Sequence, residues 1–306
     1  MTASIIDGNA VAAKVRESYR ERANRLARAG VMPGLAVVIV GNNPASEVYV
    51  GNKVKACSKV GMHSEVCRFP SDARQEEVLQ QIALLNADPS IHGIIVQLPL
   101  PARFDMRRLL EAIDREKDVD GFHLYNVGGL VIGDTVFPPC TPFGVQVLLE
   151  HAGIPIEGQN VVVVGASNLV GKPLALMLLQ KEATVAICHI KTRDLAQFTI
   201  LADILVVAAG KPKLITAPMV KRGAVVIDVG INRLADGRLV GDVDFDAVKE
   251  KAGWITPVPG GVGPMTVTML LGNTISAAER VLARGQLAAA HQAGGLPMTA
   301  GTAPAA

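Results

Sequence analysis

The sequence has little that would build a secreted or a polyanion-binding protein. Its four cysteines include no C-x-x-C pair, which indicates reduced thiols and a cytoplasmic location. The 30 Lys and Arg residues against 28 Asp and Glu leave a formal net charge of only +2. This charge is too small to hold nucleic acid or to draw the chain onto an acidic membrane. We therefore expect small molecules as partners.

Long hydrophobic runs are also missing. The longest uncharged stretch, residues 254–278, is interrupted by prolines and glycines, so we expect no membrane-spanning helix there. Near the N-terminus, charges at Asp7 and Lys14 interrupt the chain before an apolar signal segment can form. We expect neither a membrane span nor secretion.

The length of 306 residues, with 49% hydrophobic and 19% charged residues, predicts a globular chain of about two domains. In the N-terminal half, helical periodicity alternates with short apolar runs. The run at residues 35–41 is β-branched and continuously apolar, as in a parallel strand covered on both faces. This half predicts a doubly wound parallel α/β layer, with helices at 9–29, 45–60, 74–86 and 106–113 and strands at 35–41, 64–69 and 93–98.

A stretch rich in glycine and proline follows Asp118, and we interpret it as a connecting loop that builds a site. A second α/β series begins with a helix at 142–152. We predict a first domain at 1–140 with a C-terminal helix at about 268–284, and a second doubly wound domain at 141–267. Residues 285–306 are biased to alanine and glycine, so we predict a flexible tail.

Residues 160–173, NVVVVGASNLVGKP, combine a buried strand, a turn and the start of a helix. Gly165 lets the chain turn beneath a pyrophosphate, and the helix that Gly171 begins offers N–H groups to phosphates. The spacing departs from G-x-G-x-x-G because Ser167 and Val170 stand at two glycine positions. The segment predicts a Rossmann-like NAD(P)-binding domain, and a glycine-rich turn without a ligand stays the alternative.

The next predicted strand indicates which dinucleotide is preferred. It ends in HIKTRD, with no carboxylate before Asp194, where NAD sites usually place an acidic residue. Lys191 and Arg193 instead offer positive charge to a 2′-phosphate. The pattern favours NADP over NAD.

Tyr49 and Lys53 are four residues apart in a predicted helix and therefore share one face. Lys55 and Lys59 belong to a different face, and we interpret them as solvated charges. For Lys53 alone, the alternative is a surface lysine on an amphipathic helix. Tyr-x-x-x-Lys also occurs in short-chain dehydrogenases, but there it follows the cofactor strand, whereas here it precedes it.

Other polar residues stand where ligand crevices form. Gln97 ends a predicted strand, and open α/β sheets bind ligands at the carboxyl ends of their strands. Asp118 and Asp120 follow the next predicted helix. Residues 257–266 predict a rigid, charge-free loop that lines a cleft.

These residues lie in segments that resemble the bifunctional methylenetetrahydrofolate dehydrogenase/methenyltetrahydrofolate cyclohydrolase family of the FolD type. The matching segments stand in family order over about residues 5–280: SEVYVGNKVKAC, GIIVQLPLP, KDVDGFH, PPCTPFGV, VVGASNLVGKP, VIDVGINR and TPVPGGVGPMT. The resemblance implies tetrahydrofolate derivatives as substrates, NADP as cofactor, and a homodimer that pairs through the nucleotide-binding domain.

The resemblance also assigns site residues. It implies that the folate site contains Tyr49, Lys53, Gln97 and Asp120, and from the same segments we expect Leu98, Pro99, Pro259, Gly260 and Gly261 to contact substrate. It implies that the cofactor site is lined by Gly165, Ala166, Ser167, Ile190 and Ile231, to which the turn and charge patterns above add Gly171 and Lys191. Two positions depart from a common family form, since many members have Arg at Ala166 and Ser at Ile190.

The two implied reactions need different groups. Removing hydride from a carbon between two nitrogens needs positioning, whereas hydrolysis of the methenyl cation needs a proton shuttle. We expect Lys53 to be that shuttle, with a pKa lowered by burial, and Gln97 to orient its amine. We expect Tyr49 to pack on the aminobenzoate ring and Asp120 to accept hydrogen bonds from the pterin N–H groups. The alternatives are a dehydrogenase for another substrate and a non-catalytic dinucleotide-binding module.

A metal is not expected. The six histidines include no pair at metal-ligand spacing on one predicted helix face.

Overall fold

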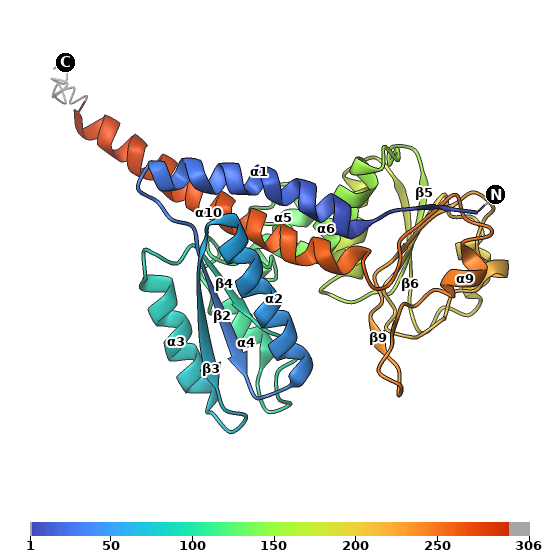
Figure 1. Cartoon of the computed structure of the whole chain (residues 1–306), viewed down its shortest axis with the longest axis horizontal. Helices are drawn as coiled ribbons and strands as arrows, with labels where there is room; N and C mark the ends of the chain where they lie inside the picture. The colour runs from blue at the N-terminus through green and yellow to red at the C-terminus, as the bar shows by residue number, and fades with distance from the viewer. Residues whose placement is uncertain (1, 294–306) are drawn as a thin grey trace, which may run out of the picture.

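The structure, a computed structural model, describes residues 2–293, and side chains as far as residue 287. Its strands form two parallel sheets and a small antiparallel ribbon (Figure 1). The first sheet has the order β3-β2-β4, built from β2 (Gly34–Val40), β3 (His63–Phe69) and β4 (Gly93–Val96). The second has the order β1-β11-β8-β7-β5-β6, built from β1 (Ser4–Ile5), β5 (Asn160–Val164), β6 (Thr184–Cys188), β7 (Ile204–Val207), β8 (Val225–Asp228) and β11 (Trp254–Ile255). The ribbon pairs β9 (Asn232–Arg233) with β10 (Leu239–Val240).

Helices cover these sheets and link them. They are α1 (Gly8–Arg28), α2 (Pro44–Val60), α3 (Gln75–Ala87), α4 (Met106–Glu111), α5 (Leu124–Ile132), α6 (Cys140–His151), α7 (Gly171–Leu179), α8 (Leu195–Thr199), α9 (Phe245–Val248) and α10 (Val262–Ala293), with a 3₁₀ turn at Ala217–Met219. The first and last helices, α1 and α10, lie side by side across the top of Figure 1. Arg22 joins them by two hydrogen bonds to Glu279, at 3.0 and 2.6 Å.

The central strand of the first sheet is β2, and all seven of its residues are buried. The helix that follows, α2, has a well-defined start and end. Asn43 accepts the N–H groups of Ala45 and Ser46, Pro44 occupies the first turn, and Gly61 ends the helix in the left-handed region at φ 81°. These caps fix the register of α2 and hence the direction of its side chains.

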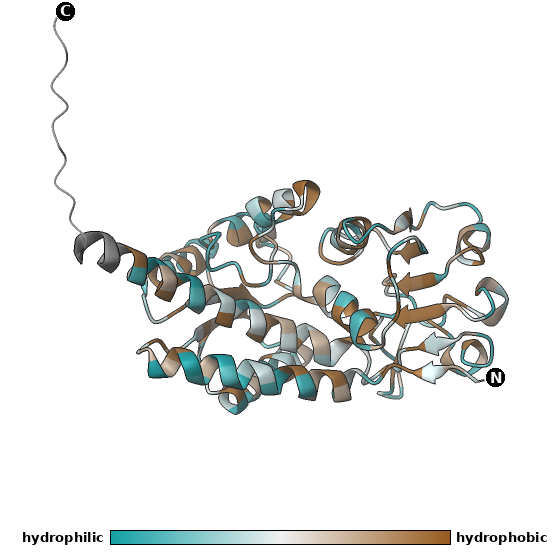
Figure 2. Cartoon of the chain, turned by 90° about the horizontal axis from the view of Figure 1, so that it is seen from above, coloured by the Kyte–Doolittle hydropathy of each residue, from teal (hydrophilic) through white to brown (hydrophobic). Residues whose placement is uncertain are grey.

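In the second sheet the central strands β7 and β8 are wholly buried. Figure 2 shows hydrophobic colour along strands of this sheet and a mixed surface on the helices. One edge strand is β1, which pairs in parallel with β11 through Ser4↔Trp254 and Ile5↔Ile255. Our prediction that residues 1–140 all belong to the first domain is therefore wrong for β1.

Three further expectations differ from the structure. The predicted tail from residue 285 is wrong as far as residue 293, because 285–293 continue α10, while 294–306 lie outside the described residues. The last helix begins at Val262 rather than near 268. Pro264 is tolerated in its first turn, because the N–H groups of a first turn have no acceptor within the helix and proline lacks only that group. The loop expected after Asp118 contains α5, which His123 caps at its start.

Among the helices of residues 2–293, none is both long and apolar enough to cross a membrane.

Candidate active site

Lys53 and Gln97 form a hydrogen-bonded pair where α2 faces the carboxyl end of β4. The Lys53 Nζ donates to Gln97 Oε1 at 3.0 Å. The amide of Gln97 also donates from Nε2 to the carbonyl of Leu98 at 2.7 Å, which turns Oε1 toward the amine. Tyr49 lies one turn before Lys53 on α2. The peptide bond between Leu98 and Pro99 is cis.

Burial and two carboxylates determine the charge balance at this pair. Burial lowers the pKa of the Lys53 amine, and the negative charge of Asp120 opposes that shift. Burial raises the pKa of Asp120, the positive charge of Lys53 lowers it, and Asp118 raises it. The neutral amine is therefore more accessible than in an exposed lysine.

The loop that carries Asp120 is held from two sides. Asp118 is fully buried and accepts the N–H groups of Phe122 at 3.2 Å and His123 at 2.8 Å. From α10, Asn273 donates to the carbonyl of Val119 at 2.8 Å. The C-terminal helix thus fixes a loop of the first sheet beside Lys53.

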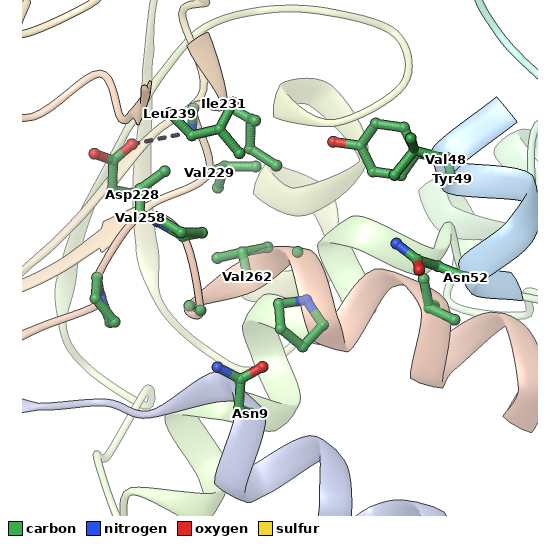
Figure 3. Close-up of a pocket in the computed structure, with 18 of the residues that line it drawn as sticks. Asn9, Val48, Tyr49, Asn52, Asp228, Val229, Ile231, Leu239, Val258 and Val262 are labelled. Carbon is green, nitrogen blue, oxygen red and sulfur yellow. Dashed lines mark hydrogen bonds between the residues drawn. The ribbon is translucent and has the colours of Figure 1, made fainter. Parts of the chain in front are cut away.

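A cavity of about 670 Å³ opens beside this pair, between α2 and the loops of the second sheet. In Figure 3, Tyr49 projects from α2 into it, with Ile231 and Val229 on the opposite side. The predicted residues that line it are Tyr49, Ile231, Pro259, Gly260 and Gly261, whereas Lys53, Gln97 and Asp120 lie outside its lining. Tyr49 therefore lines the cavity one helical turn from Lys53.

Sequence reasoning missed several of the cavity's polar residues. Asn9 at the start of α1 and Asn52 on α2 line it. So do Lys55 and Lys59, which we interpreted as solvated charges and which are indeed exposed. The spacing of Val48, Asn52, Lys55 and Lys59 marks a second continuous face of α2, and that periodicity was the available signal.

The turn from β5 to α7 is too tight for a side chain at either predicted glycine. Gly165 has φ +122°, and a Cβ there would lie 2.1 Å from the carbonyl oxygen of Ala208. A Cβ on Gly171 would lie 1.8 Å from the carbonyl oxygen of Gly165. Ser167 Oγ accepts the N–H of Val170 at 3.1 Å and of Gly171 at 3.4 Å. The backbone thus approaches closely at the carboxyl end of β5, as a pyrophosphate turn requires.

The residues after β6 and β8 leave an apolar and basic surface beside this turn. Ile190 is 96% exposed and Ile231 is 46% exposed, which is unusual for isoleucine. Lys191 and Arg193 are exposed, and within residues 2–287 neither takes part in an ion pair. Apolar side chains for a base and free cations for a phosphate fit a dinucleotide with a 2′-phosphate.

Two buried aspartates hold the loops around the same crevice. Asp228 accepts the N–H groups of Gly230 and Asp242, both at 3.0 Å, and of Val243 at 2.9 Å. Asp242 in turn accepts the N–H of Gly210 at 2.8 Å. Burial raises the pKa of Asp228 to about 6. These carboxylates fix the loops that follow β7 and β8.

No cluster of three or more His, Cys, Asp or Glu suited to a metal ion is found among the side chains that the structure describes.

Two family profiles divide the chain between them. The catalytic domain of the tetrahydrofolate dehydrogenase/cyclohydrolase family matches residues 6–120, and its NAD(P)-binding domain matches residues 139–282. The chain belongs to the tetrahydrofolate dehydrogenase/cyclohydrolase family. The predicted boundary between residues 140 and 141 stays a prediction, although α6 begins next to it, at Cys140.

Relatives of this family resemble the chain over nearly its whole length. The bifunctional protein FolD of Nitrosospira multiformis is 66% identical over 284 residues, which cover 93% of this chain and 99% of that protein. The FolD crystal structure from Campylobacter jejuni has a TM-score of 0.90 at 50% identity and covers 91% of this chain and 99% of its own. That of Trypanosoma brucei, complexed with NADP cofactor and inhibitor, has a TM-score of 0.89 at 40% identity and covers 92% and 99%.

Proposed function

We propose that this family member catalyses two consecutive reactions of one-carbon folates. It oxidises 5,10-methylenetetrahydrofolate to 5,10-methenyltetrahydrofolate with NADP and then hydrolyses that product to 10-formyltetrahydrofolate. The observation that carries the proposal is the hydrogen bond of 3.0 Å between Lys53 and Gln97, beside a cavity lined from both halves of the chain.

The oxidation depends on position. The methylene carbon loses hydride, and its two flanking nitrogens stabilise the resulting cation without an acid or base. NADP, when bound, supplies the hydride acceptor. Tyr49, 41% exposed at the cavity, offers its ring to the aminobenzoate, and Pro259, Gly260 and Gly261 bound the same cavity. These residues hold the carbon facing the crevice at Gly165.

The hydrolysis depends on proton transfer. Water adds to the methenyl carbon and loses a proton, the bond from that carbon to a ring nitrogen breaks, and the nitrogen leaves protonated. The Lys53 amine takes the proton from water and returns it to the nitrogen. Gln97 orients the amine through Oε1, and Asp120 accepts hydrogen bonds from the pterin N–H groups.

NADP is the cofactor that the crevice favours. Lys191 and Arg193 are exposed and without ion pairs within residues 2–287, while the departure at Ile190 removes a hydroxyl. The relative from Trypanosoma brucei was solved with NADP. Positive charge at the end of β6 suits a 2′-phosphate because a phosphate binds best where cations are available.

We also infer a homodimer that pairs through the nucleotide-binding domain. Its edge strand β6 presents Ile187 at 43% exposure, and the α8 region presents Phe198 at 43% and Leu201 at 65%. Sedimentation equilibrium should give twice the chain mass, and Leu201→Asp should shift the measured mass toward that of the monomer; a monomeric parent protein would refute the dimer.

All four cysteines are free, which supports a reducing, cytoplasmic compartment.

The test is a spectrophotometric assay with methylenetetrahydrofolate and NADP, which follows reduced cofactor and the methenyl chromophore together. We expect reduced NADP to accumulate while the methenyl signal rises and then decays. A dehydrogenase for another substrate, or a non-catalytic dinucleotide-binding module, would produce neither reduced NADP nor the methenyl signal from methylenetetrahydrofolate. The absence of turnover with both NADP and NAD would refute the proposal.

A further inference from the structure

A buried carboxylate behind the crevice of the second sheet joins two of its loops. Asp242 is fully buried and lies outside the lining of the cavity. Its Oδ2 accepts the N–H groups of Ala209 at 2.7 Å and Gly210 at 2.8 Å, in the segment that follows β7. Its Oδ1 accepts a hydrogen bond from Asn232 Nδ2 at 2.8 Å, in the segment that follows β8. One side chain therefore ties together the segments after two neighbouring strands.

On the side of β8, Asp242 holds the chain on both sides of Ile231. A Cβ on Gly230 would lie 2.3 Å from the carboxylate of Asp242, so the carboxylate can sit this close only to glycine. Asn232, which donates to the same carboxylate, follows Ile231 directly. Ile231 itself lines the cavity opposite Tyr49 (Figure 3). The position of Ile231 in the cavity thus depends on Asp242.

On the side of β7, Asp242 supports the turn from β5 to α7. Ala209, which donates to Asp242, directly follows Ala208. The N–H of Ala208 donates to the carbonyl of Val164 at 2.7 Å, and its carbonyl oxygen is the atom that a side chain at Gly165 would strike. The segment after β7 therefore backs the turn at Gly165, and Asp242 fixes that segment.

A second buried carboxylate holds Asp242 in place. Asp228 Oδ1 accepts the N–H of Asp242 at 3.0 Å, and Asp228 Oδ2 accepts the N–H of Val243 at 2.9 Å. A Cβ on Gly241 would lie 1.8 Å from Asp228 Oδ2. The N–H of Asp228 in turn donates to Thr256 Oγ1 at 2.8 Å. Asp242 is thus fixed at its backbone as well as at its carboxylate, which suits it to set a distance between two loops.

We infer that Asp242 is a positioning residue for hydride transfer, because it fixes the separation between the turn at Gly165 and Ile231 and hence the place of the nicotinamide ring beside the folate. The inference rests on the proposed function, since it needs a folate in the cavity beside Tyr49. A dinucleotide whose pyrophosphate binds at the turn extends along the carboxyl ends of the strands. Hydride transfer needs reacting atoms about 3–3.5 Å apart, and a misplacement of about 1 Å costs up to about 100-fold in rate.

Hydrolysis does not share this dependence. Its proposed groups, Lys53 and Gln97, belong to α2 and to the end of β4 in the first sheet. A change at Asp242 should therefore slow the dehydrogenase and leave the hydrolysis of added methenyltetrahydrofolate unchanged. A general loss of folded protein would lower both rates together, because one buried core contains residues of both sheets, such as Val37 and Val163. The two activities of one chain thus separate a positioning role from a structural one.

The experiment uses the variants Asp242→Asn and Asn232→Ala. The amide in Asp242→Asn keeps one acceptor oxygen and turns an N–H group toward donors that the carboxylate accepted, so part of the network is lost. Asn232→Ala removes a single bond and leaves the carboxylate. At saturating NADP we expect kcat of the dehydrogenase to fall about 10–100-fold in Asp242→Asn and less in Asn232→Ala. The control Asp246→Asn removes a carboxylate whose side chain is 84% exposed and should leave both activities intact.

Cofactor binding supplies a readout that needs no turnover. The emission of reduced nicotinamide rises when a protein holds the ring apart from the adenine on which it stacks in solution. Titration with NADPH should give a smaller emission gain at saturation in Asp242→Asn than in the parent protein. The affinity should change less than the emission, because Lys191, Arg193 and the turn at Gly165 are retained.

Any one of three results would overturn the inference: an unchanged dehydrogenase kcat in Asp242→Asn, an equal loss of both activities, or an emission gain at saturation equal to that of the parent protein. If the parent protein catalysed neither reaction, the proposed function would fail. The NADPH titration would then still decide whether Asp242 positions the nicotinamide ring.

Discussion

Replacing Gln97 by glutamate tests the electrostatics of the proposed proton shuttle. The substitution keeps the size of the side chain and places a negative charge at the atom that accepts from Lys53 at 3.0 Å. An opposite charge this close raises the pKa of an amine by about 1–3 units. It would therefore oppose the burial that lowers the pKa of Lys53 in the parent protein.

The magnitude of the effect on hydrolysis follows from that shift. While the pKa of the amine exceeds the assay pH, each unit lowers the fraction of neutral amine about tenfold, so Gln97→Glu should slow hydrolysis about 10–1000-fold near pH 7. The acid limb of the pH–rate profile should move upward by the same 1–3 units. The dehydrogenase should change much less, because hydride transfer does not use this proton.

The assay follows the decay of the methenyl chromophore across about pH 6–10, since the shifted limb must fall inside the range. Gln80→Glu adds the same charge on an exposed position of α3 and serves as the control. A Gln97→Glu variant with native circular dichroism and an unshifted acid limb would show that Lys53 is not the group that titrates.

Four further variants test other parts of the site. Lys53→Met should still reduce NADP but accumulate the methenyl intermediate, with hydrolysis about 10²–10⁴-fold slower, whereas Asp120→Asn should weaken both activities; a Lys53→Met variant that hydrolyses normally would contradict the shuttle. Joint replacement of Lys191 and Arg193 by alanine should raise KM for NADP far more than KM for NAD, and high salt should narrow this difference. Equal changes of the two KM values in steady-state kinetics would show that neither side chain contacts the 2′-phosphate. Asp228 has a folded pKa of about 6 against an ordinary 3.8, so its ionisation should reduce the free energy of unfolding by about 2 kcal/mol as pH rises from about 4 to 6. Urea titrations at both pH values should show that loss relative to Asp228→Asn, and a parallel pH dependence of the two proteins would refute it.

The features that sequence patterns predicted well are local. The apolar run of β2, the shared face of Tyr49 and Lys53, and the tight turn at Gly165 each depend on a few neighbouring residues. The contact between Gln97 and Lys53 was expected from the family resemblance; it forms because β4, which ends just before Gln97, pairs with β2, the strand that leads into α2.

The features that were missed depend on distant parts of the chain. A strand of two residues such as β1 carries no periodic signal, and its partner lies near the other end of the sequence. The full length of α10 was hidden by Pro264 and by a composition poor in large apolar residues. Lys55 and Lys59 looked solvated because the wall opposite them comes from residues 228–264.

The pairing of β1 with β11 sets an order on folding during synthesis. Ser4 pairs with Trp254, so 254 − 4 = 250 residues separate the partners. At about 5–20 residues per second, the ribosome needs about 12–50 s between making the two strands. β1 is thus an edge strand of a sheet whose other strands all follow it in the sequence. Through that interval the backbone groups of β1 lack the partner strand that binds them in the folded chain.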